Sequence, residues 1–138
     1  MAMFPKSVMI LVVDDSATIR ATIRNELAQM GYLNVREAMD GVDAIEKLTT
    51  AEQKIPFALV ISDWNMPNMT GVELLEKVRE NFSLAKLPFI LLTSENEVNQ
   101  VATAISLNVS GYIIKPLGKG ILKQKLEAVW KKHNPTAG

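Results

Sequence analysis

The sequence contains no cysteine and a single histidine, His133, which lies close to the C-terminal end. Without cysteine the chain has no disulfide framework, no thiolate chemistry and no cysteine-based metal site. Basic and acidic residues are equal in number, 15 − 15 = 0, so the positive net charge that favours nucleic-acid binding is missing. Carboxylates, hydroxyls and amines are therefore the groups available for chemistry.

No run of about 18 apolar residues is present either, so we expect no membrane span. The first 15 residues carry one lysine and end in two acids, and they lack the charged start and the cleavage site of a signal peptide. We interpret them as leading into the first strand, and we expect a cytoplasmic protein. The 138 residues are predicted to form one domain over 1–138, with its core within about 7–132.

Apolar runs that suit buried strands alternate with segments of helical periodicity over the whole chain. The expected strands are 8–13, 33–38, 57–62, 88–93 and 111–115. Runs without polar alternation are typical of a parallel sheet that helices cover on both faces. The expected inward-facing helix positions are Ile19, Ile23 and Leu27; Ile45 and Leu48; Leu74, Leu75 and Val78; Val98, Val101, Ala102 and Ile105; and Ile121, Leu122, Leu126, Val129 and Trp130. Gly31 is predicted to end the first helix, and Asp40 to cap the second.

Five such strand–helix units in succession predict a doubly wound α/β domain, in which the weak run 33–38 lies at an edge of the sheet. In folds of this kind, ligands bind beyond the carboxyl ends of the strands. The residues expected at those ends are Asp14, Asp15, Asp63, Thr93 and Lys115. We therefore expect three carboxylates, a hydroxyl and an amine to converge at one edge of the sheet.

Three neighbouring carboxylates repel one another, by roughly 4 kcal/mol per pair at 4 Å and an effective dielectric constant near 20. A fold tolerates this arrangement if a carboxylate is protonated or if a cation lies among them. Oxygen ligands favour Mg²⁺, with Mn²⁺ as an alternative. Asp63 stands alone at the end of its strand, so it is the candidate nucleophile toward phosphorus. Lys115 would then neutralise phosphoryl oxygens, and the Thr93 hydroxyl would donate a hydrogen bond to them.

Each of these residues, taken alone, also has an ordinary structural explanation. The pair Asp14–Asp15 after a strand often caps the next helix, and Asp63 could form an Asx turn that ends its strand. Thr93 would often be a helix cap, and Lys115 a solvated side chain. Their joint occurrence in the right order at four strand ends is what favours a site.

Four sequence motifs carry a resemblance to a known family. They are VVDDS at 12–16, SDWNMPNMTG at 62–71, TSE at 93–95 and GYIIKP at 111–116. Over nearly its full length the chain resembles the receiver domain of two-component response regulators, and most of all the single-domain chemotaxis regulators of the CheY type. The resemblance implies a flavodoxin-like three-layer sandwich with strands in the order 2-1-3-4-5.

The resemblance also implies a role for each matching residue. The implied roles are phosphoacceptor for Asp63; Mg²⁺ ligand for Asp14, Asp15, Asp63 and the backbone carbonyl of Asn65; phosphoryl contact for Thr93 and Lys115; and rotamer switch for Tyr112. The Met-Pro loop would fix the backbone so that Asn65 faces the metal, and the Lys115–Pro116 peptide bond would be cis. The protein would be a phosphoacceptor signalling protein rather than an enzyme, with self-catalysed phosphoryl transfer and slow self-dephosphorylation.

The implied partners are a histidine kinase as phosphoryl donor and a flagellar motor switch protein as target, with a phosphatase as a further candidate. We expect neither a nucleic-acid nor a membrane partner, and we expect a monomer. The last helix runs out in the polar stretch 131–138. No output domain is therefore expected, and output would be recognition of the surface by another protein.

Two other functions share parts of this pattern. A phosphohydrolase with an aspartyl nucleophile usually carries a second Asp two residues later, where this chain has Asn65, and its cap domain would need further residues. A phosphorelay intermediate would have the same site, and would differ in its partners and in the lifetime of its phosphoryl group. Two positions depart from the pattern that the resemblance implies. Ser16 stands where chemotaxis relatives carry an aromatic residue, and Thr70 replaces the Asp that often precedes the glycine of the loop. We expect these departures to affect local capping or surface recognition.

Overall fold

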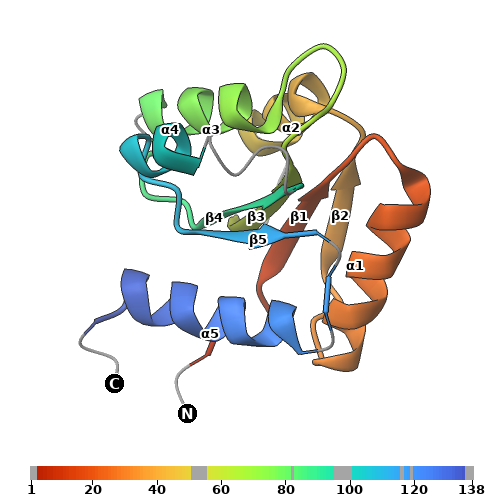
Figure 1. Ribbon diagram of the computed structural model, residues 1–138. Coiled ribbons are helices and arrows are strands. Elements are labelled where there is room, and N and C mark those ends of the chain that lie inside the picture. Colours follow the sequence, from red (N-terminus) through yellow and green to blue (C-terminus); the bar gives the residue numbers. More distant parts are fainter. Residues whose placement is uncertain are drawn as a thin grey trace.

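The computed structural model describes residues 3–50, 56–81, 83–94, 101–115, 117–118 and 120–135. Within them the strands are β1 (Met9–Val13), β2 (Val35–Ala38), β3 (Phe57–Asp63), β4 (Phe89–Thr93) and β5 (Gly111–Ile114). The helices of the same residues are α1 (Ala17–Gln29), α2 (Gly41–Thr49), α3 (Gly71–Glu80), α4 (Val101–Ser106) and α5 (Ile121–His133). Neighbouring strands are parallel and follow the order β2-β1-β3-β4-β5 (Figure 1). The predicted doubly wound fold and the edge position of the second strand are confirmed.

The sheet separates two apolar cores, because successive side chains of a strand point to opposite faces. Along β1, Ile10 and Val12 belong to the core that α1 and α5 cover, whereas Leu11 and Val13 belong to the core under α2, α3 and α4. Figure 1 shows the same division, with α2, α3 and α4 on one face of the sheet and α5 on the other. All five residues of β1 are buried, which explains why the strand reads as a continuous apolar run.

The predicted signals at helix ends are present where the sequence places them. Helix α1 ends at Gln29, and Gly31 takes a left-handed conformation with φ of 96°, which glycine adopts without steric cost. Helix α2 is capped by Asp40, whose side chain accepts a hydrogen bond of 2.8 Å from the amide of Asp43. Among the described residues, no helix is long and apolar enough to cross a lipid bilayer.

The start of the second strand and the inward face of the fourth helix differ from the prediction. Strand β2 begins at Val35 rather than at residue 33, and Leu33 is 73% exposed. In α4 the inward residues are Val101 and Ala104, whereas Ile105 is 58% exposed and Ala102 is also exposed; Val98 lies outside the described residues. The predicted spacing fits a helical stripe, but the small Ala104 side chain is the one in contact with the core.

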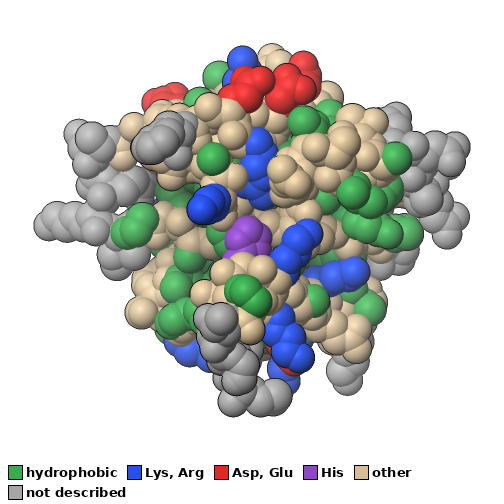
Figure 2. Space-filling model, turned by 90° about the vertical axis from the view of Figure 1, so that its left-hand side faces the viewer, with side chains coloured by type: hydrophobic (Ala, Val, Ile, Leu, Met, Phe, Trp, Pro, Cys, Tyr) green, Lys and Arg blue, Asp and Glu red, His purple; other side chains and the backbone are tan. Residues whose placement is uncertain are grey.

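The connection between α4 and β5 lies at the amino edge of the sheet, opposite the carboxyl ends of the strands. Figure 2 shows this side of the molecule, where Lys and Arg side chains surround the histidine. Arg79 donates hydrogen bonds from Nε and Nη2 to the carbonyl oxygen of Asn108, at 3.0 and 2.8 Å. His133 Nε2 lies 2.7 Å from the hydroxyl of Ser110. These side chains fix the connection that leads into β5.

Candidate functional site

The predicted site residues lie at the carboxyl ends of β1, β3, β4 and β5. Asp14 and Asp15 follow β1, Asp63 is the last residue of β3, Thr93 is the last residue of β4, and Lys115 follows β5. The strand ladder continues past the last of these ends, because the amide of Lys115 donates to the carbonyl oxygen of Thr93 at 2.7 Å. The parallel strands therefore deliver these residues to one edge of the sheet, as the sequence predicts.

The three acids form a cluster. One carboxylate oxygen from each of Asp14, Asp15 and Asp63 lies within 4.8 Å of the other two. Asp14 and Asp63 are 1% and 6% exposed, whereas Asp15 is exposed to solvent. Three carboxylate oxygens at this spacing, with solvent on one side, form an arrangement that can hold a divalent cation.

Lys115 is the cation that the chain itself supplies to the cluster. Its Nζ atom lies 2.6 Å from Oδ1 of Asp63. The Asp63 side chain is 8% exposed and that of Lys115 is 30% exposed, so the ion pair spans the boundary between the core and solvent. Burial raises the pKa of the Asp63 carboxyl above its usual range, and the hydrogen bond and charge of Lys115 act against this rise.

Asp14 has one partnered and one unpartnered carboxylate oxygen. Its Oδ1 accepts a hydrogen bond of 2.8 Å from the amide of Ser16, while Oδ2 is buried with no hydrogen-bond partner among the described residues. Burial raises the pKa of Asp14 to about 6; the Ser16 bond lowers the pKa and the charge of Asp63 raises it. A buried carboxylate oxygen without a donor is costly unless a cation or a proton compensates it.

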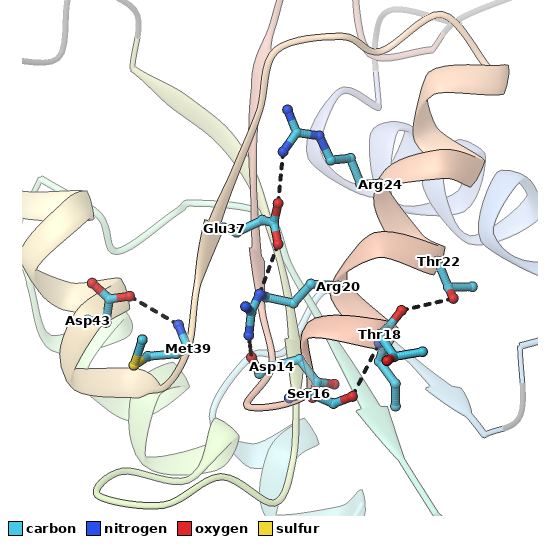
Figure 3. A network of polar contacts seen from close by, with 10 residues as sticks. Asp14, Ser16, Thr18, Arg20, Thr22, Arg24, Glu37, Met39 and Asp43 are labelled. Atoms are coloured by element: carbon cyan, nitrogen blue, oxygen red, sulfur yellow. Dashed lines mark hydrogen bonds and ion pairs between the residues drawn. The ribbon is translucent and has the colours of Figure 1, made fainter.

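A network of polar side chains from α1 and β2 contacts the backbone of Asp14 (Figure 3). Arg20 donates from Nη1 to the carbonyl oxygen of Asp14 at 2.6 Å, and its Nε lies 2.9 Å from Oε1 of Glu37. Arg24 Nη1 lies 2.8 Å from the other carboxylate oxygen of Glu37. These contacts lower the pKa of Glu37 and tie α1 and β2 to the segment that carries the acids. Sequence reasoning missed this network, because Arg20 and Glu37 are 17 positions apart and match no local pattern.

The loop after β3 turns sharply back over the end of its own strand. Trp64 and Met66 are buried, with 4% and 7% exposure. The amide of Gly71 donates to the carbonyl oxygen of Trp64 at 2.8 Å and closes the loop. A Cβ atom at position 71 would overlap the carbonyl oxygen of Asp63. The glycine at the end of the motif therefore allows a close approach to the backbone of the central acid.

Thr93 lies in the interior of the fold, whereas Tyr112 lies partly at its surface. Thr93 is fully buried, and its hydroxyl donates to the carbonyl oxygen of Ser94 at 3.3 Å. Tyr112 is half-buried on β5, and Lys125 Nζ lies 5.4 Å from the centre of its ring. Glu95 and Pro116 lie outside the described residues, so the cis peptide bond stays a prediction.

Ser16 and Thr70, the two positions that depart from the pattern implied by the resemblance, both cap helices. The Ser16 hydroxyl accepts from the amide of Ile19 at 3.3 Å, so Ser16, and not the acidic pair, caps α1. Thr70 accepts from the amide of Glu73 at 3.2 Å, and the Glu73 carboxylate accepts from the amide of Thr70 at 2.9 Å. This reciprocal arrangement is a capping box at the start of α3.

A parallel sheet in this order with an acidic cluster at its carboxyl edge defines a class of protein. The chain belongs to the response regulator receiver domain family, whose sequence model matches residues 10–127. The resemblance drawn from the four motifs is thereby confirmed.

Relatives with chemotaxis names are similar over most of the chain. Chemotaxis protein CheY1 of Helicobacter pylori is 45% identical over 121 residues, which are 87% of this chain and 94% of that protein. Chemotaxis protein CheY-3 of Vibrio cholerae is 37% identical over 131 residues, or 95% and 98% of the two chains. A solved structure of Vibrio cholerae chemotaxis protein CheY4 matches with a TM-score of 0.77 and 33% identity, covering 88% of this chain and 98% of that one.

Proposed function

We propose that this protein is a phosphorylation-controlled switch of a chemotaxis-type two-component system. Asp63 accepts a phosphoryl group from a histidine kinase, and the modified protein changes its affinity for a target. The observation that carries this proposal is the cluster itself, with three carboxylate oxygens within 4.8 Å and Lys115 2.6 Å from Asp63.

The cluster fits a magnesium ion by its chemistry. All three side chains offer oxygen, and Asp14 Oδ2 is a buried acceptor that lacks a protein donor among the described residues. Asp14, Asp15 and Asp63 would hold the ion, with the backbone carbonyl of Asn65 as a further ligand; Mn²⁺ would suit the same oxygens. When bound, the ion neutralises carboxylate and phosphoryl charge.

Asp63 is the proposed acceptor because it is a buried carboxylate at the end of the central strand β3, next to the exposed Asp15. Its carboxylate oxygen forms the new bond to phosphorus as the bond between phosphorus and the donor histidine nitrogen breaks. Lys115 Nζ already contacts Oδ1 and is placed to pair with phosphoryl oxygens. The chain supplies positioning and charge neutralisation rather than a separate catalytic base, in agreement with the demands of phosphoryl transfer.

Thr93 and Tyr112 transmit the change. The Thr93 hydroxyl donates to the carbonyl oxygen of Ser94 at 3.3 Å, and in the phosphorylated protein it donates to a phosphoryl oxygen instead. Tyr112 then turns inward and alters the surface formed by α4, β5 and α5. Phosphorylation shifts this equilibrium only as far as its contacts differ between the two states.

The partners follow from the family and from the named relatives. Receiver domains act with histidine kinases, and the similar proteins from Helicobacter pylori and Vibrio cholerae carry chemotaxis names. A flagellar motor switch protein is therefore the proposed target of the phosphorylated form. A phosphatase that shortens the lifetime of the signal is a further proposed partner.

Tryptophan fluorescence tests the core of the proposal. Trp64 follows Asp63 directly, so beryllofluoride, a phosphoryl mimic, should change its emission in a saturable way that requires Mg²⁺. The change should disappear in Asp63→Asn. Trp130, which packs edge-on against Phe4 on the other side of the sheet, is removed as a background by Trp130→Phe. A response that survives Asp63→Asn, or no response at all, would show that the acids are structural.

A further inference from the structure

The loop between β3 and α3, residues 64–70, is held at its base by the core. Trp64 and Met66 are buried on either side of Asn65, and the Gly71 amide closes the base through its bond to the Trp64 carbonyl. These contacts fix two side chains and one end of the loop. At the tip, around Asn68, the amide of Met69 donates to the carbonyl oxygen of Pro67 at 2.7 Å, a local bond that does not tie the tip to another element.

A pair of side chains fixes that tip. Asn68 has a left-handed backbone with φ of 68°, which is uncommon outside glycine, and its Nδ2 atom donates to Oδ2 of Asp40 at 2.7 Å. Asp40 is 7% exposed, and its other oxygen accepts from the Asp43 amide at the start of α2. Beside this bond Met69 lies so close to Gly41 that an added Cβ would be 2.7 Å from it.

We propose that Asp40 and Asn68 are a positioning pair for the metal site: they hold the loop so that the carbonyl of Asn65 is directed at the cation. The inference rests on the proposed function, because it assumes that Asn65 is a ligand. Neither residue needs to touch the metal. The pair acts by restricting the backbone between the buried Met66 and the left-handed Asn68, where Pro67 already limits φ. Contacts that hold a metal ligand in place without touching the metal commonly influence the affinity of the site.

Asn68→Asp tests the pair, because displacement of the loop and the added negative charge should change Mg²⁺ affinity in opposite directions. Asn68→Asp places a carboxylate against the Asp40 carboxylate and drives the tip of the loop away from α2. The same substitution adds a negative charge near a cation site, which by electrostatics alone should strengthen Mg²⁺ binding. Weaker binding would therefore report displacement of the loop.

The experiment measures Mg²⁺ affinity by isothermal titration calorimetry on the full chain. Asn68→Asp should weaken Mg²⁺ binding about tenfold, at the lower end of the range for residues that orient metal ligands. The double variant Asp40→Asn with Asn68→Asp restores a donor facing a carboxylate, keeps the wild-type net charge and should recover most of the affinity. Asn108→Asp is the matched control, because Asn108 is the other described non-glycine residue with positive φ, at 61°, and lies at the opposite edge of the sheet.

Urea unfolding of the same variants separates position from stability. A purely structural pair would lower the free energy of unfolding in Asn68→Asp while Mg²⁺ affinity stayed unchanged or rose, and that result would overturn the proposal. Failure of the double variant to regain affinity would overturn it too. If wild type itself bound no Mg²⁺, or bound it equally well after Asp63→Asn, the proposed function would fail first and the positioning role with it.

Discussion

Lys115 and Asp63 form an ion pair of 2.6 Å that joins the ends of β5 and β3 across the intervening strand β4. The carboxylate is buried and its pKa is raised by that burial, so Lys115 stabilises the ionised form that a metal ligand and nucleophile must have. The same contact places a positive charge where a divalent cation would repel it. Lys115 is therefore expected to oppose Mg²⁺ and to favour the phosphoryl group.

Lys115→Ala should separate those two effects. Loss of the ammonium removes repulsion of at least roughly 1 kcal/mol, the value for unit charges 4 Å apart when the dielectric constant is that of water, so Mg²⁺ affinity should rise about fivefold or more. Beryllofluoride affinity should fall, because its fluorines lose a charged donor. Calorimetry measures both, with Lys125→Ala as a control, since Lys125 lies over the Tyr112 ring instead. A parallel fall in both affinities would mean that Lys115 serves only to hold the site together.

Asp14 makes the stability of the metal-free protein depend on pH. Its pKa rises from the usual 3.8 to about 6 on folding, so the native state holds this proton more tightly than the unfolded chain does. Asp14 therefore supports folding while it is protonated, and its contribution is lost as pH rises from its unfolded pKa of 3.8 through about 6. Above that pH, ionised Asp14 costs on the order of 2–3 kcal/mol.

Asp14→Asn should therefore raise the free energy of unfolding by about 2 kcal/mol at pH 7.5 without Mg²⁺. The gain should shrink on acidification and vanish near about pH 3.5, where both states of wild type carry the proton. Urea titrations across this range measure it, and Asp15→Asn, the same change at an exposed carboxylate, should show a smaller gain. An equal gain in both variants would assign the effect to net charge rather than to burial.

Acidification should also weaken Mg²⁺ binding by wild type, because the metal must displace the Asp14 proton. Calorimetry at pH 7.5 and at pH 5 should show a lower affinity at the acidic pH. Measurements in buffers of different ionisation enthalpy should show proton uptake by the buffer near pH 6, where the Asp14 carboxyl titrates. Affinity that stays constant over this range would place Asp14 outside the metal's ligands.

Gly71→Ala should destabilise the protein by about 3 kcal/mol, at the upper end of the usual cost of overpacking, because the backbone atoms that the new methyl group meets have no room to move. The added methyl group would overlap the Asp63 carbonyl oxygen and approach Leu91 Cδ2 at 2.9 Å. Urea unfolding measures the loss. Gly118→Ala is the matched control, since among the described residues its Cβ meets the side chain of Ile121 alone within 4 Å, at 3.2 Å. Similar losses in the two variants would remove the special role of Gly71.

The sequence was sufficient to predict which residues converge, because the carboxyl ends of parallel strands share one edge of the sheet. Asp63 and Lys115 are 52 positions apart (115 − 63 = 52), yet each ends or follows an apolar run, and this local signal predicted that both lie at the same edge of the sheet. The 2.6 Å contact between them is visible only in the structure. Asp40 as a cap and Gly31 as a helix end were equally local, and both were correctly predicted.

The features that the sequence did not predict are contacts between side chains that are distant in the chain, and the choice of which side of α4 faces the core. The Asn68–Asp40 bond spans 28 positions, and neither residue is marked by a periodic pattern as the partner of the other. In α4, the apolar Ile105 faces outward while Ala104 faces the core. The metal-ligand role of the Asn65 carbonyl and the rotamer change of Tyr112 stay predictions.

The capping box at the start of α3 depends on Thr70, which stands where the resemblance implies an Asp. Thr70→Ala removes the acceptor for the Glu73 amide and should lower the free energy of unfolding by about 1 kcal/mol. Thr70→Asp retains an acceptor at the N-cap, but its charge lies beside the Glu73 carboxylate, so its stability should lie between those of wild type and Thr70→Ala. Urea unfolding at low and high salt measures both, and salt should bring Thr70→Asp closer to wild type by screening that repulsion. Equal stability of Thr70→Ala and wild type would mean that tertiary packing alone determines where α3 begins.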